Sequence, residues 1–474
     1  MADNSKLQIA MFPWLAFGHM IPWLELAKLI AQKGHKIFFI SAPRNLDRLP
    51  KLPPNLASSI HFVKLPLPRV HNLPENAEAT VDLSYDEVWY LKQASDCLQQ
   101  PMKQLLLSLA PDWLLFDFTA HWLPSISRQL GIPNCFFSIF TAATLGYLGP
   151  SSVLINGSDD LKTPEGYARV PNWVPFRTTV AYRLFEAKKI FHLLTGDESN
   201  LSHVYRFGES LKGCDIIAVR SCMEFEPEWL KLVEQLHQKP VFPVGQLPTT
   251  DNDMEEETET WRWIKDWLDT QEKGSVVYVA FGSEAKPTQE ELTEIALGLE
   301  QSKLPFFWVL KKGLGQADTE LIDLPDGFEE RTKGRGIVYT SWAPQLKILG
   351  HDSVGGFLTH SGWSSVVEGL QFGRALVLLT FYADQGLNAK LLQEKNIGYV
   401  IPREEEDGSF SSNSVAESLK LVFVEKDGEI YRNKAKEMKG LFGERERPNL
   451  YVDNFLSYLE THRFLHKSEE MKSN

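Results

Sequence analysis

The stretch that decides the fold is WAPQLKILGHDSVGGFLTHSGWSSVVEGLQFGRALVLLTFYADQ, which runs from Trp342 to Gln385. Its apolar run at Gly355–Leu358 predicts a buried strand, and His360–Ser364 predicts a tight turn that leads into a helix. The start of a helix presents backbone N–H groups and a positive dipole end, which together bind anions. The stretch therefore predicts a phosphate site where a strand of a parallel sheet ends and a helix begins.

Five side chains of this stretch suit a nucleotide and a sugar. Trp342 offers a flat face for a base, and Glu368 offers two acceptor oxygens for the adjacent hydroxyls of a ribose. His360 adds a donor beside the helix start, while Asp384 and Gln385 follow the next strand and suit the hydroxyls of a sugar. Each residue alone is more often an ordinary structural residue, so the prediction depends on the spacing of the whole set.

Both halves of the chain alternate short apolar runs with amphipathic stretches, which is typical of parallel α/β sheets. The strands expected in the first half are Leu7–Phe12, Lys36–Ile40, Trp113–Phe116, Asn134–Phe140 and Asp215–Arg220. Those expected in the second half are Val276–Phe281, Phe306–Leu310, Ile337–Thr340, Gly355–Leu358 and Leu376–Leu379. The pattern predicts two doubly wound α/β domains that face a cleft.

Composition and charge exclude several classes of protein. The 474 residues are 43% hydrophobic and 23% charged, a globular composition in a chain too long for a single core. A net charge of −13 argues against sequence-independent binding to nucleic acid or anionic lipid. The four cysteines show no CxxC spacing, and no apolar run is clean enough for a membrane span or a signal peptide. We expect a cytoplasmic monomer without a nucleic-acid partner.

A second set of functional residues is expected near the start of the chain. His19 lies in MFPWLAFGHMIP, between the first strand and the first helix, where the helix start disfavours its cation. Asp117 ends another strand, within WLLFDFTAHW, and is expected at the same edge of the sheet. His121, four residues further on, is a rival candidate for the same chemistry.

These motifs resemble those of the plant family 1 UDP-dependent glycosyltransferases. The resemblance covers W-x-P-Q, H-x-x-V-G-G-F-L-T-H-x-G-W-x-S, E-G and D-Q in the second half, and the histidine motif FPxxxxGHxxP in the first. It extends over nearly the whole chain and implies the GT-B fold of two Rossmann-like domains. Ser364 replaces a common Asn, and Ala375 and Thr380 replace two prolines. These differences resemble the branch that adds a sugar to the sugar of a glycoside, which includes UDP-rhamnose-dependent rhamnosyltransferases.

The resemblance implies a role for each residue of the donor site. Trp342 stacks on uracil, Ala343 and Gln345 bind the base and ribose, and Glu368 binds the ribose hydroxyls. The diphosphate contacts the helix start together with Ser283, His360 and Ser365, and the transferred sugar contacts Asp384, Gln385 and the backbone at Trp363. The other residues assigned to the UDP-sugar are Thr141, Gly362, Ser364 and Tyr382.

The implied mechanism is an inverting transfer without a metal. His19 takes the proton of the acceptor hydroxyl, while Asp117 orients the imidazole and offsets its new charge. The UDP-sugar is a co-substrate, and no cofactor is expected. The sequence Asp251–Asn252–Asp253 resembles a metal-binding DxD, but it lies in an acidic run with no strand before it, so we expect no metal site there.

The expected domains are an acceptor-binding domain at 1–243, an acidic linker at 244–262, a UDP-sugar-binding domain at 263–448, and a helix returning to the first domain, followed by a loose tail, at 449–474. The walls of the acceptor pocket are expected at His71–Tyr90 and Phe140–Arg206. The residues expected nearest the reacting hydroxyl are Phe17, Phe118 and Thr141.

The sequence leaves two alternatives for the donor sugar and two for the class of acceptor. The donor sugar is rhamnose, slightly favoured by the resemblance, or glucose, and the expected acceptor is a flavonoid or terpenoid glycoside. The alternative is glucosylation of an aglycone of specialised metabolism or of a xenobiotic. An inactive nucleotide-sugar-binding protein is disfavoured because both His19 and Asp117 are present. An NAD-dependent oxidoreductase is disfavoured because no GxGxxG follows a strand.

Overall fold

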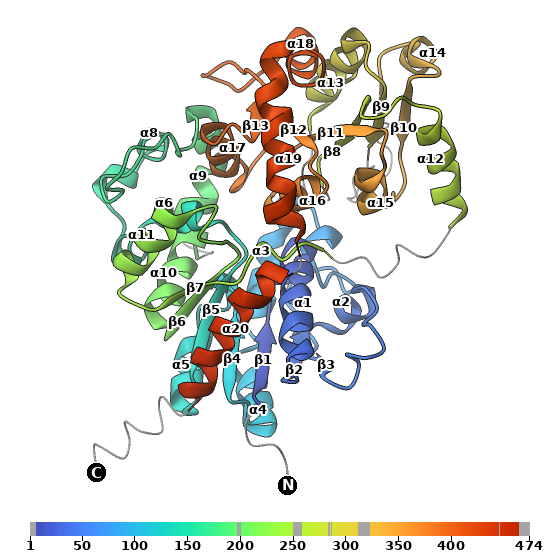
Figure 1. Cartoon of the computed structure of the whole chain (residues 1–474). Coiled ribbons are helices and arrows are strands. Elements are labelled where there is room, and N and C mark those ends of the chain that lie inside the picture. Colours follow the sequence, from blue (N-terminus) through green and yellow to red (C-terminus); the bar gives the residue numbers. More distant parts are fainter. Residues whose placement is uncertain are drawn as a thin grey trace, which may run out of the picture. The chain divides into compact units, whose positions relative to one another are not determined.

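The computed structural model describes residues 6–196, 201–249, 258–282, 285, 287–310, 323–444 and 446–463. The chain divides into two compact units, each built around a parallel sheet with helices packed on it (Figure 1). Unit 1 comprises residues 1–162, 192–250 and 445–474, and unit 2 comprises residues 163–191 and 251–444. The sequence prediction placed all of residues 1–243 in the first domain, whereas the structure places residues 163–191 in unit 2. Residues 250–257 of the predicted acidic linker at 244–262 lie outside the described residues.

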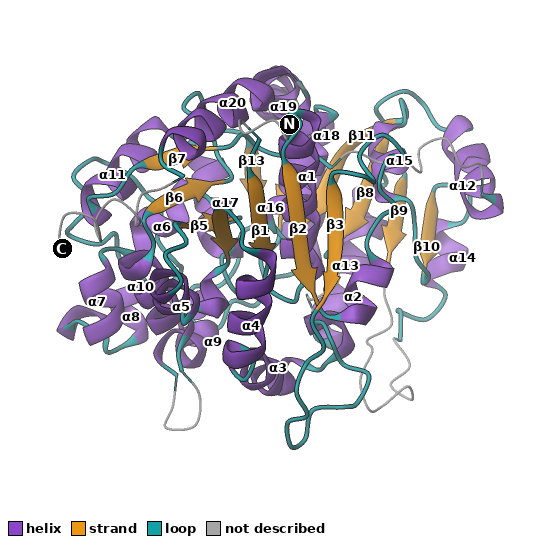
Figure 2. Cartoon of the chain, turned by 90° about the horizontal axis from the view of Figure 1, so that it is seen from below, coloured by secondary structure: helices purple, strands orange, loops and turns teal. Residues whose placement is uncertain are grey.

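Unit 1 contains a seven-stranded parallel sheet in the order β3-β2-β1-β4-β5-β6-β7. Figure 2 shows β1, β2 and β3 side by side. The strands are β1 (Gln8–Phe12), β2 (Lys36–Ser41), β3 (Ile60–Lys64), β4 (Trp113–Phe116), β5 (Asn134–Ser138), β6 (Ile216–Val219) and β7 (Val241–Pro243). The strand order changes direction between β1 and β4. The segments that follow these two strands therefore leave the sheet side by side at its carboxyl edge, where α/β proteins bind ligands.

All the helices of unit 1 except the C-terminal α20 lie in the connections between these strands. The α-helices are α1 (Phe17–Gln32), α2 (Pro43–Arg48), α3 (Val88–Asp96), α4 (Gln99–Leu109), α5 (Leu123–Gln129), α6 (Ala142–Leu148), α7 (Ser151–Asn156), α10 (His203–Gly213), α11 (Pro227–His237) and α20 (Glu446–Thr461). The short 3₁₀ helices are η1 (Thr80–Asp82), η2 (Tyr85–Glu87), η3 (Phe118–Ala120) and η4 (Asp159–Leu161). Helix α9 (Leu184–Thr195) begins in unit 2 and ends in unit 1.

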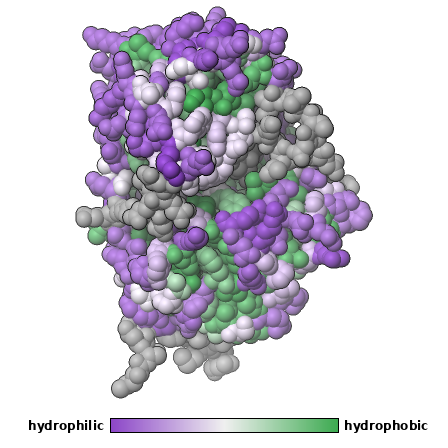
Figure 3. All heavy atoms as spheres, turned by 90° about the vertical axis from the view of Figure 1, so that its right-hand side faces the viewer, coloured by the Kyte–Doolittle hydropathy of each residue, from purple (hydrophilic) through white to green (hydrophobic). Residues whose placement is uncertain are grey.

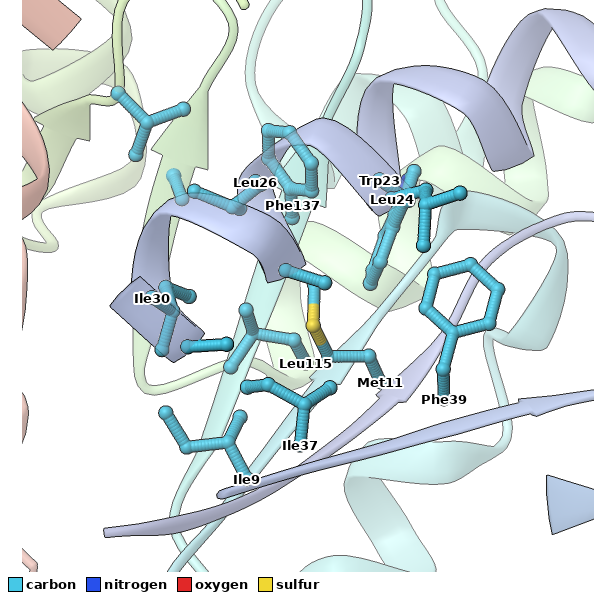
Figure 4. Packing of buried hydrophobic residues seen from close by; sticks show 14 of the residues in the cluster. Ile9, Met11, Trp23, Leu24, Leu26, Ile30, Ile37, Phe39, Leu115 and Phe137 are labelled. Carbon is cyan, nitrogen blue, oxygen red and sulfur yellow. The ribbon is translucent and has the colours of Figure 1, made fainter. Parts of the chain in front are cut away.

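The core of unit 1 lies between α1 and the sheet (Figure 4). Trp23, Leu26 and Ile30 recur at helical spacing on one face of α1, and each is 0% exposed. The strands meet this face with every second residue, because side chains alternate between the two faces of a sheet. The strand residues labelled in this layer are Ile9, Met11, Ile37, Phe39, Leu115 and Phe137.

The C-terminal helix α20 packs on the sheet of unit 1, whose strands are distant from it in the sequence. Val452, Phe455 and Leu459 lie on one face of α20 and are 0% exposed. The indole Nε1 of Trp113, on β4, donates to the carbonyl oxygen of Leu459 at 2.9 Å. The ring of Phe242 lies 5.8 Å from that of Phe455, measured between centroids. Hydrophobic burial and one buried hydrogen bond therefore hold the end of the chain on this sheet.

Unit 2 contains a six-stranded parallel sheet in the order β10-β9-β8-β11-β12-β13. Its strands are β8 (Val276–Ala280), β9 (Phe306–Val309), β10 (Gly336–Tyr339), β11 (Val354–Thr359), β12 (Ala375–Leu378) and β13 (Gly398–Val400). Its helices are α8 (Pro164–Tyr167), α12 (Glu259–Asp269), α13 (Gln289–Ser302), α14 (Phe328–Thr332), α15 (Gln345–Gly350), α16 (Trp363–Gln371), α17 (Gln385–Glu394), α18 (Ser412–Phe423), η6 (Lys426–Gly428) and α19 (Glu429–Gly443). The order changes direction between β8 and β11, which again places a ligand edge beyond two central strands.

The predicted fold class is confirmed, and all ten predicted strands coincide with observed ones to within two residues at either end. The prediction missed β3, β7 and β13, each of which lies at an edge of its sheet. Edge strands are covered less completely than central ones, so they lack the continuous apolar run that marked the others. Two of the three are also only three residues long.

The distribution of hydrophilic and hydrophobic side chains agrees with the globular composition of the sequence. Figure 3 shows one face of the molecule, on which hydrophilic residues are interspersed with hydrophobic ones. The largest hydrophobic side chains are buried, among them Trp23, Trp113 and Trp308. Among the described helices, none is both long and apolar enough to cross a bilayer.

The packing of α20 leads to a stability prediction. Phe455→Ala is expected to lower the free energy of unfolding by about 3–5 kcal/mol, because it removes a fully buried ring. Leu450→Ala, on the same helix, is the matched control: Leu450 is 66% exposed, so a change within about 0.5 kcal/mol is expected. Urea denaturation measures both. Equal effects of the two substitutions would contradict the docking of α20.

Candidate active site

The first candidate site lies in unit 1, at the carboxyl ends of β1 and β4. Phe12 and Phe116 are partners in the parallel pairing, and the N–H of Asp117 donates to the carbonyl oxygen of Phe12 at 3.3 Å. His19 is in the first turn of α1, which begins just after β1. The result is a contact of 2.7 Å between His19 Nδ1 and Asp117 Oδ2. The adjacency of two central strands thus brings together residues 98 positions apart in sequence.

Backbone N–H groups donate to both oxygens of the Asp117 carboxylate and fix its orientation. Its Oδ2 accepts from the N–H of Trp14 at 3.1 Å and its Oδ1 from the N–H of Phe118 at 2.8 Å. The side chain of Asp117 is 2% exposed and that of His19 12%. With Nδ1 on the carboxylate, Nε2 is the ring nitrogen that can accept a proton from a substrate. The pair has the arrangement of a general base with its orienting acid.

Aromatic rings surround the imidazole of His19. Its ring centroid lies 5.9 Å from that of Phe118 and 5.4 Å from that of Phe140. Phe207, on α10, stacks on Phe118 at 4.3 Å and contacts Phe140 edge-on at 5.4 Å. The surroundings of the base are therefore apolar and suit a flat or polycyclic organic molecule.

The rival histidine, His121, belongs to a different cluster. Its Nδ1 lies 3.2 Å from the Nη1 of Arg206, which itself forms a two-pronged ion pair with Asp96 at 2.7 and 2.5 Å. Burial lowers the pKa of His121, and the Arg206 guanidinium lowers it further. The carboxylate nearest to His121, Asp96 at 3.9 Å from its Nδ1, is already bound by Arg206, so the geometry favours His19 as the base.

The second candidate site lies in unit 2, at the end of β11. After His360 the chain turns through Ser361, whose φ of 70° is left-handed, and Gly362 then precedes α16 with no side chain capping the helix. A left-handed backbone at a residue other than glycine is strained, and such strain is concentrated at functional sites. The turn directs the first amides of α16 toward the carboxyl edge of the sheet, as the sequence predicted for a phosphate site.

Two glycines hold the imidazole of His360. A Cβ atom on Gly362 would lie 2.3 Å from His360 Nε2, and one on Gly282 would lie 2.8 Å from its Cε1. Gly282 follows β8, whose last residue Ala280 pairs with Thr359 of β11. Burial lowers the pKa of His360 to about 4, so the imidazole is neutral at pH 7. It can bind a diphosphate as an N–H donor rather than as a cation.

A short hydrogen-bonded chain orients Glu368. The hydroxyl of Tyr278 donates to Oε1 of Gln345 at 3.1 Å, and the Nε2 of Gln345 donates to Oε2 of Glu368 at 2.5 Å. Tyr278 is 1% exposed and was not predicted, although it lies on the predicted strand β8. Trp342, by contrast, is 70% exposed, which leaves a large aromatic face open for stacking. Ala343, next to it, is buried.

Asn388 connects the segment predicted to bind the sugar with the turn predicted to bind the phosphates. Its Nδ2 donates to Asp384 Oδ2 at 2.7 Å and to the carbonyl oxygen of Ser361 at 3.1 Å. Gln385 Oε1 accepts from the N–H of Phe381 at 2.8 Å, which fixes the carbonyl end of its amide and leaves the NH₂ group as the donor end. Sequence reasoning missed Asn388, although its position four residues after Asp384 on α17 is a signal that it shares a helix face with Asp384.

The remaining predicted residues are placed as follows. Ser364 and Ser365 are in the first turn of α16 after Trp363, and Tyr382 precedes the left-handed Ala383, whose φ is 57°. Phe17 begins α1, and the Arg48 guanidinium lies 5.0 Å above its ring. Thr141 is 0% exposed and caps α6 by accepting from the N–H of Thr144, so its assignment to the UDP-sugar stays a prediction.

Ser283 and the Asp251–Asp253 sequence lie outside the described residues. The part of the chain that the structure describes holds no metal-binding cluster of His, Cys, Asp and Glu.

Comparison with known proteins decides the family. A family model described as UDP-glucoronosyl and UDP-glucosyl transferase matches residues 235–450. UDP-glycosyltransferase 91A1 of Arabidopsis thaliana is 54% identical, over 97% of this chain and 98% of that protein. The chain belongs to the plant family 1 UDP-glycosyltransferases. This enzyme therefore transfers a sugar from a UDP-sugar.

Further relatives and solved structures agree with this family. UDP-glycosyltransferase 91D2 of Stevia rebaudiana is 48% identical to the enzyme, over 97% of its chain and 96% of the relative. The soyasaponin III rhamnosyltransferase of Glycine max is 40% identical, over 98% and 97%. The crystal structure of TcCGT1 in complex with UDP superposes with a TM-score of 0.77 at 24% identity, covering 96% of this chain and 99% of that one. The enzyme has the GT-B fold of two Rossmann-like parallel-sheet domains.

The glycines beside His360 lead to a binding prediction. Gly362→Ala is expected to lower the affinity for UDP about tenfold or more, because the added Cβ displaces the imidazole that is predicted to donate to the diphosphate. Gly440→Ala is the control, because a Cβ there meets nothing closer than 3.6 Å. Isothermal titration with UDP measures both variants. An unchanged affinity in Gly362→Ala would exclude His360 from the diphosphate site.

The low pKa of His360 leads to a pH prediction. NMR of histidine-labelled enzyme without ligand is expected to show the imidazole titrating near pH 4, with no transition between pH 6 and 8. Since the folded pKa lies below the ordinary value of 6.5, the unfolded chain binds more protons between these two pH values. This histidine therefore lowers the stability of the fold as the pH falls from 6.5 toward 4. The resonance is assigned by its loss in His360→Gln, and a midpoint near 6.5 would contradict the prediction.

Proposed function

We propose that the enzyme transfers a hexose, rhamnose or glucose, from its UDP-sugar to a hydroxyl of a small-molecule glycoside, with inversion and without a metal. The observation that carries the proposal is the 2.7 Å contact between His19 Nδ1 and Asp117 Oδ2 in apolar surroundings. A sugar or phenolic hydroxyl attacks an anomeric carbon only if its proton leaves as the new bond forms, and this pair can accept that proton.

The proton step follows from the hydrogen bonds of the pair. Nδ1–H of His19 donates to Asp117, so Nε2 takes the proton of the acceptor hydroxyl, and the imidazole becomes positively charged. Asp117 then lies beside a cation, which lowers the energy of the charged state. The carboxylate keeps its orientation throughout, because Trp14 and Phe118 donate to it from the backbone.

We propose that each part of the UDP-sugar contacts a different set of residues in unit 2. The base stacks on Trp342, and the ribose hydroxyls meet Glu368, which Gln345 holds in place. The diphosphate meets the start of α16 and the neutral imidazole of His360. The sugar meets Asp384 and the amide of Gln385. As the bond to the sugar breaks, negative charge grows on the diphosphate, and the helix start and the imidazole N–H stabilise it.

The acceptor class is proposed from the rings near His19 and from the relatives. Phe118, Phe140 and Phe207 offer an apolar surface for the ring system of a flavonoid or terpenoid. Besides the soyasaponin III rhamnosyltransferase, the relatives include the anthocyanidin-3-O-glucoside rhamnosyltransferase of Petunia hybrida, 35% identical. These names support rhamnose as donor sugar and a glycoside of specialised metabolism as acceptor.

The direct test is incubation with UDP-rhamnose and UDP-glucose in parallel, each against flavonoid glycosides, terpenoid glycosides and their aglycones. The product mass identifies the sugar added, and the reactive panel identifies the acceptor class. We expect a deoxyhexose added to a glycoside. Turnover only with UDP-glucose on aglycones would support the alternative, an aglycone glucosyltransferase.

Substitutions at the base test the mechanism. His19→Ala and Asp117→Asn are each expected to lower kcat by about 10²–10⁴-fold, because both remove general-base assistance. Neither is expected to change the affinity for UDP, because the proposed UDP contacts all lie in unit 2. His121→Gln is the histidine control and is expected to keep kcat within about twofold, since His121 contacts the Arg206–Asp96 pair and not the proposed base. Full turnover in His19→Ala would refute the base assignment.

A further inference from the structure

Residues 163–191 pack on unit 2 although the chain on both sides of them belongs to unit 1. At one end of α17, Glu394 accepts three hydrogen bonds through Oε2. The hydroxyl of Thr178 and the N–H of Thr179 donate at 2.8 Å each, and the hydroxyl of Thr179 donates at 3.1 Å. These contacts fix the segment beside the helix that begins with Gln385.

At the other end of α17, the same segment forms a buried triangle with Thr380. Oε1 of Glu186 accepts from the hydroxyl of Thr380 at 2.6 Å and from Nη2 of Arg183 at 2.6 Å. The same Nη2 lies 2.7 Å from the hydroxyl of Thr380. Glu186 is 6% exposed and Thr380 1%. Burial alone would raise the pKa of Glu186, but the charge of Arg183 together with the hydrogen bonds from Arg183 and Thr380 outweighs burial and holds this pKa below its usual value.

The triangle lies directly against the proposed sugar-binding residues. A Cβ atom on Gly386 would lie 2.5 Å from Glu186 Oε2 and 3.0 Å from a ring carbon of Tyr182. Gly386 immediately follows Gln385, and only three residues separate Thr380 from Asp384. The absence of a side chain at 386 is therefore what lets the Glu186 carboxylate reach the start of α17.

The loop between Thr380 and α17 needs such support. It has no regular secondary structure and contains Ala383 in a left-handed conformation, which persists only where the surroundings hold it. The side chain of Arg403 donates to the carbonyl oxygen of Thr380 and forms an ion pair of 2.9 Å with Glu291 on α13. Arg183 thus contacts the side chain of Thr380, the first residue of the loop, and Arg403 contacts its backbone.

We propose that Thr380, with Glu186 and Arg183, is a positioning residue that sets Asp384 and Gln385 for the transferred sugar. The inference rests on the proposed function, in which those two residues bind that sugar. The resemblance to the family gives proline as the common residue at this position. Proline has no hydroxyl to donate to Glu186, so the contact is a property of chains that carry threonine or serine here.

Thr380→Val tests the proposal, because it keeps the shape of the side chain and removes only the hydroxyl. We expect the KM for the UDP-sugar to rise about tenfold, because a buried carboxylate loses one donor and the loop loses its anchor. The affinity for UDP itself is expected to stay within twofold, because the base and diphosphate contacts lie elsewhere. Glu186→Gln is a second variant with the same expected pattern, and Thr380→Ser is expected to restore the parent KM.

The control is Thr332→Val. Thr332 is a threonine of unit 2 that is 2% exposed and whose hydroxyl donates to the carbonyl oxygen of Phe328 at 2.9 Å. It tests whether loss of any buried threonine hydrogen bond has the same effect. A KM within twofold of the parent in Thr380→Val, or an equal loss of UDP affinity, would overturn the positioning role. So would a KM change of the same size in Thr332→Val.

Gln385→Ala separates failure of this inference from failure of the proposed function. Titrations of the intact enzyme with UDP-glucose, UDP-rhamnose and UDP compare the three ligands. If Gln385→Ala loses affinity for the UDP-sugars and Thr380→Val does not, only the positioning role is wrong. If Gln385→Ala binds UDP-sugars as the parent does, the proposed sugar site itself is wrong.

Discussion

Both candidate sites depend on one constraint, the parallel pairing of two central strands where the strand order of a sheet changes direction. In unit 1 these strands are β1 and β4, and in unit 2 they are β8 and β11. Parallel pairing places their carboxyl ends at the same edge, and the connections that follow leave in opposite directions. Polar residues that follow each strand then meet at that edge. His19 meets Asp117 in this way, and His360 lies against Gly282.

The two histidines show how one residue type serves two kinds of chemistry. His19 has a carboxylate partner on Nδ1, the arrangement that the proposed role as a general base requires. His360 is enclosed between two glycines, and burial lowers its pKa to about 4. In the proposed donor site, such a neutral imidazole contributes a directed hydrogen bond to the diphosphate rather than an ion pair. The neighbours of each ring therefore decide whether it moves a proton or binds an anion.

The part of unit 2 that is proposed to bind the sugar is supported by hydrogen bonds between residues of several elements. Asn388 connects Asp384 to the turn at Ser361, and Glu186 connects Thr380 to the start of α17. The Asn388–Ser361 and Thr380–Glu186 hydrogen bonds are buried, so the loss of either donor leaves an acceptor unsatisfied. The strained conformations at Ser361 and Ala383 are held within this network. A small change in it is therefore expected to affect the sugar more than the nucleotide.

The sequence by itself determined the fold class, ten of the strands, the family and the candidate residues from Trp342 to Gln385 together with His19 and Asp117. These features are local, because hydrophobic periodicity and motif spacing are expressed within a few dozen residues. The tertiary structure alone decided that residues 163–191 belong with unit 2, that Asn388 and Tyr278 support the site, and that Thr141 caps a helix. Thr380 and Glu186 are 194 residues apart in the chain. No local pattern encodes which distant partner a buried polar side chain will meet, because that partner is selected only when the sheets and helices have packed.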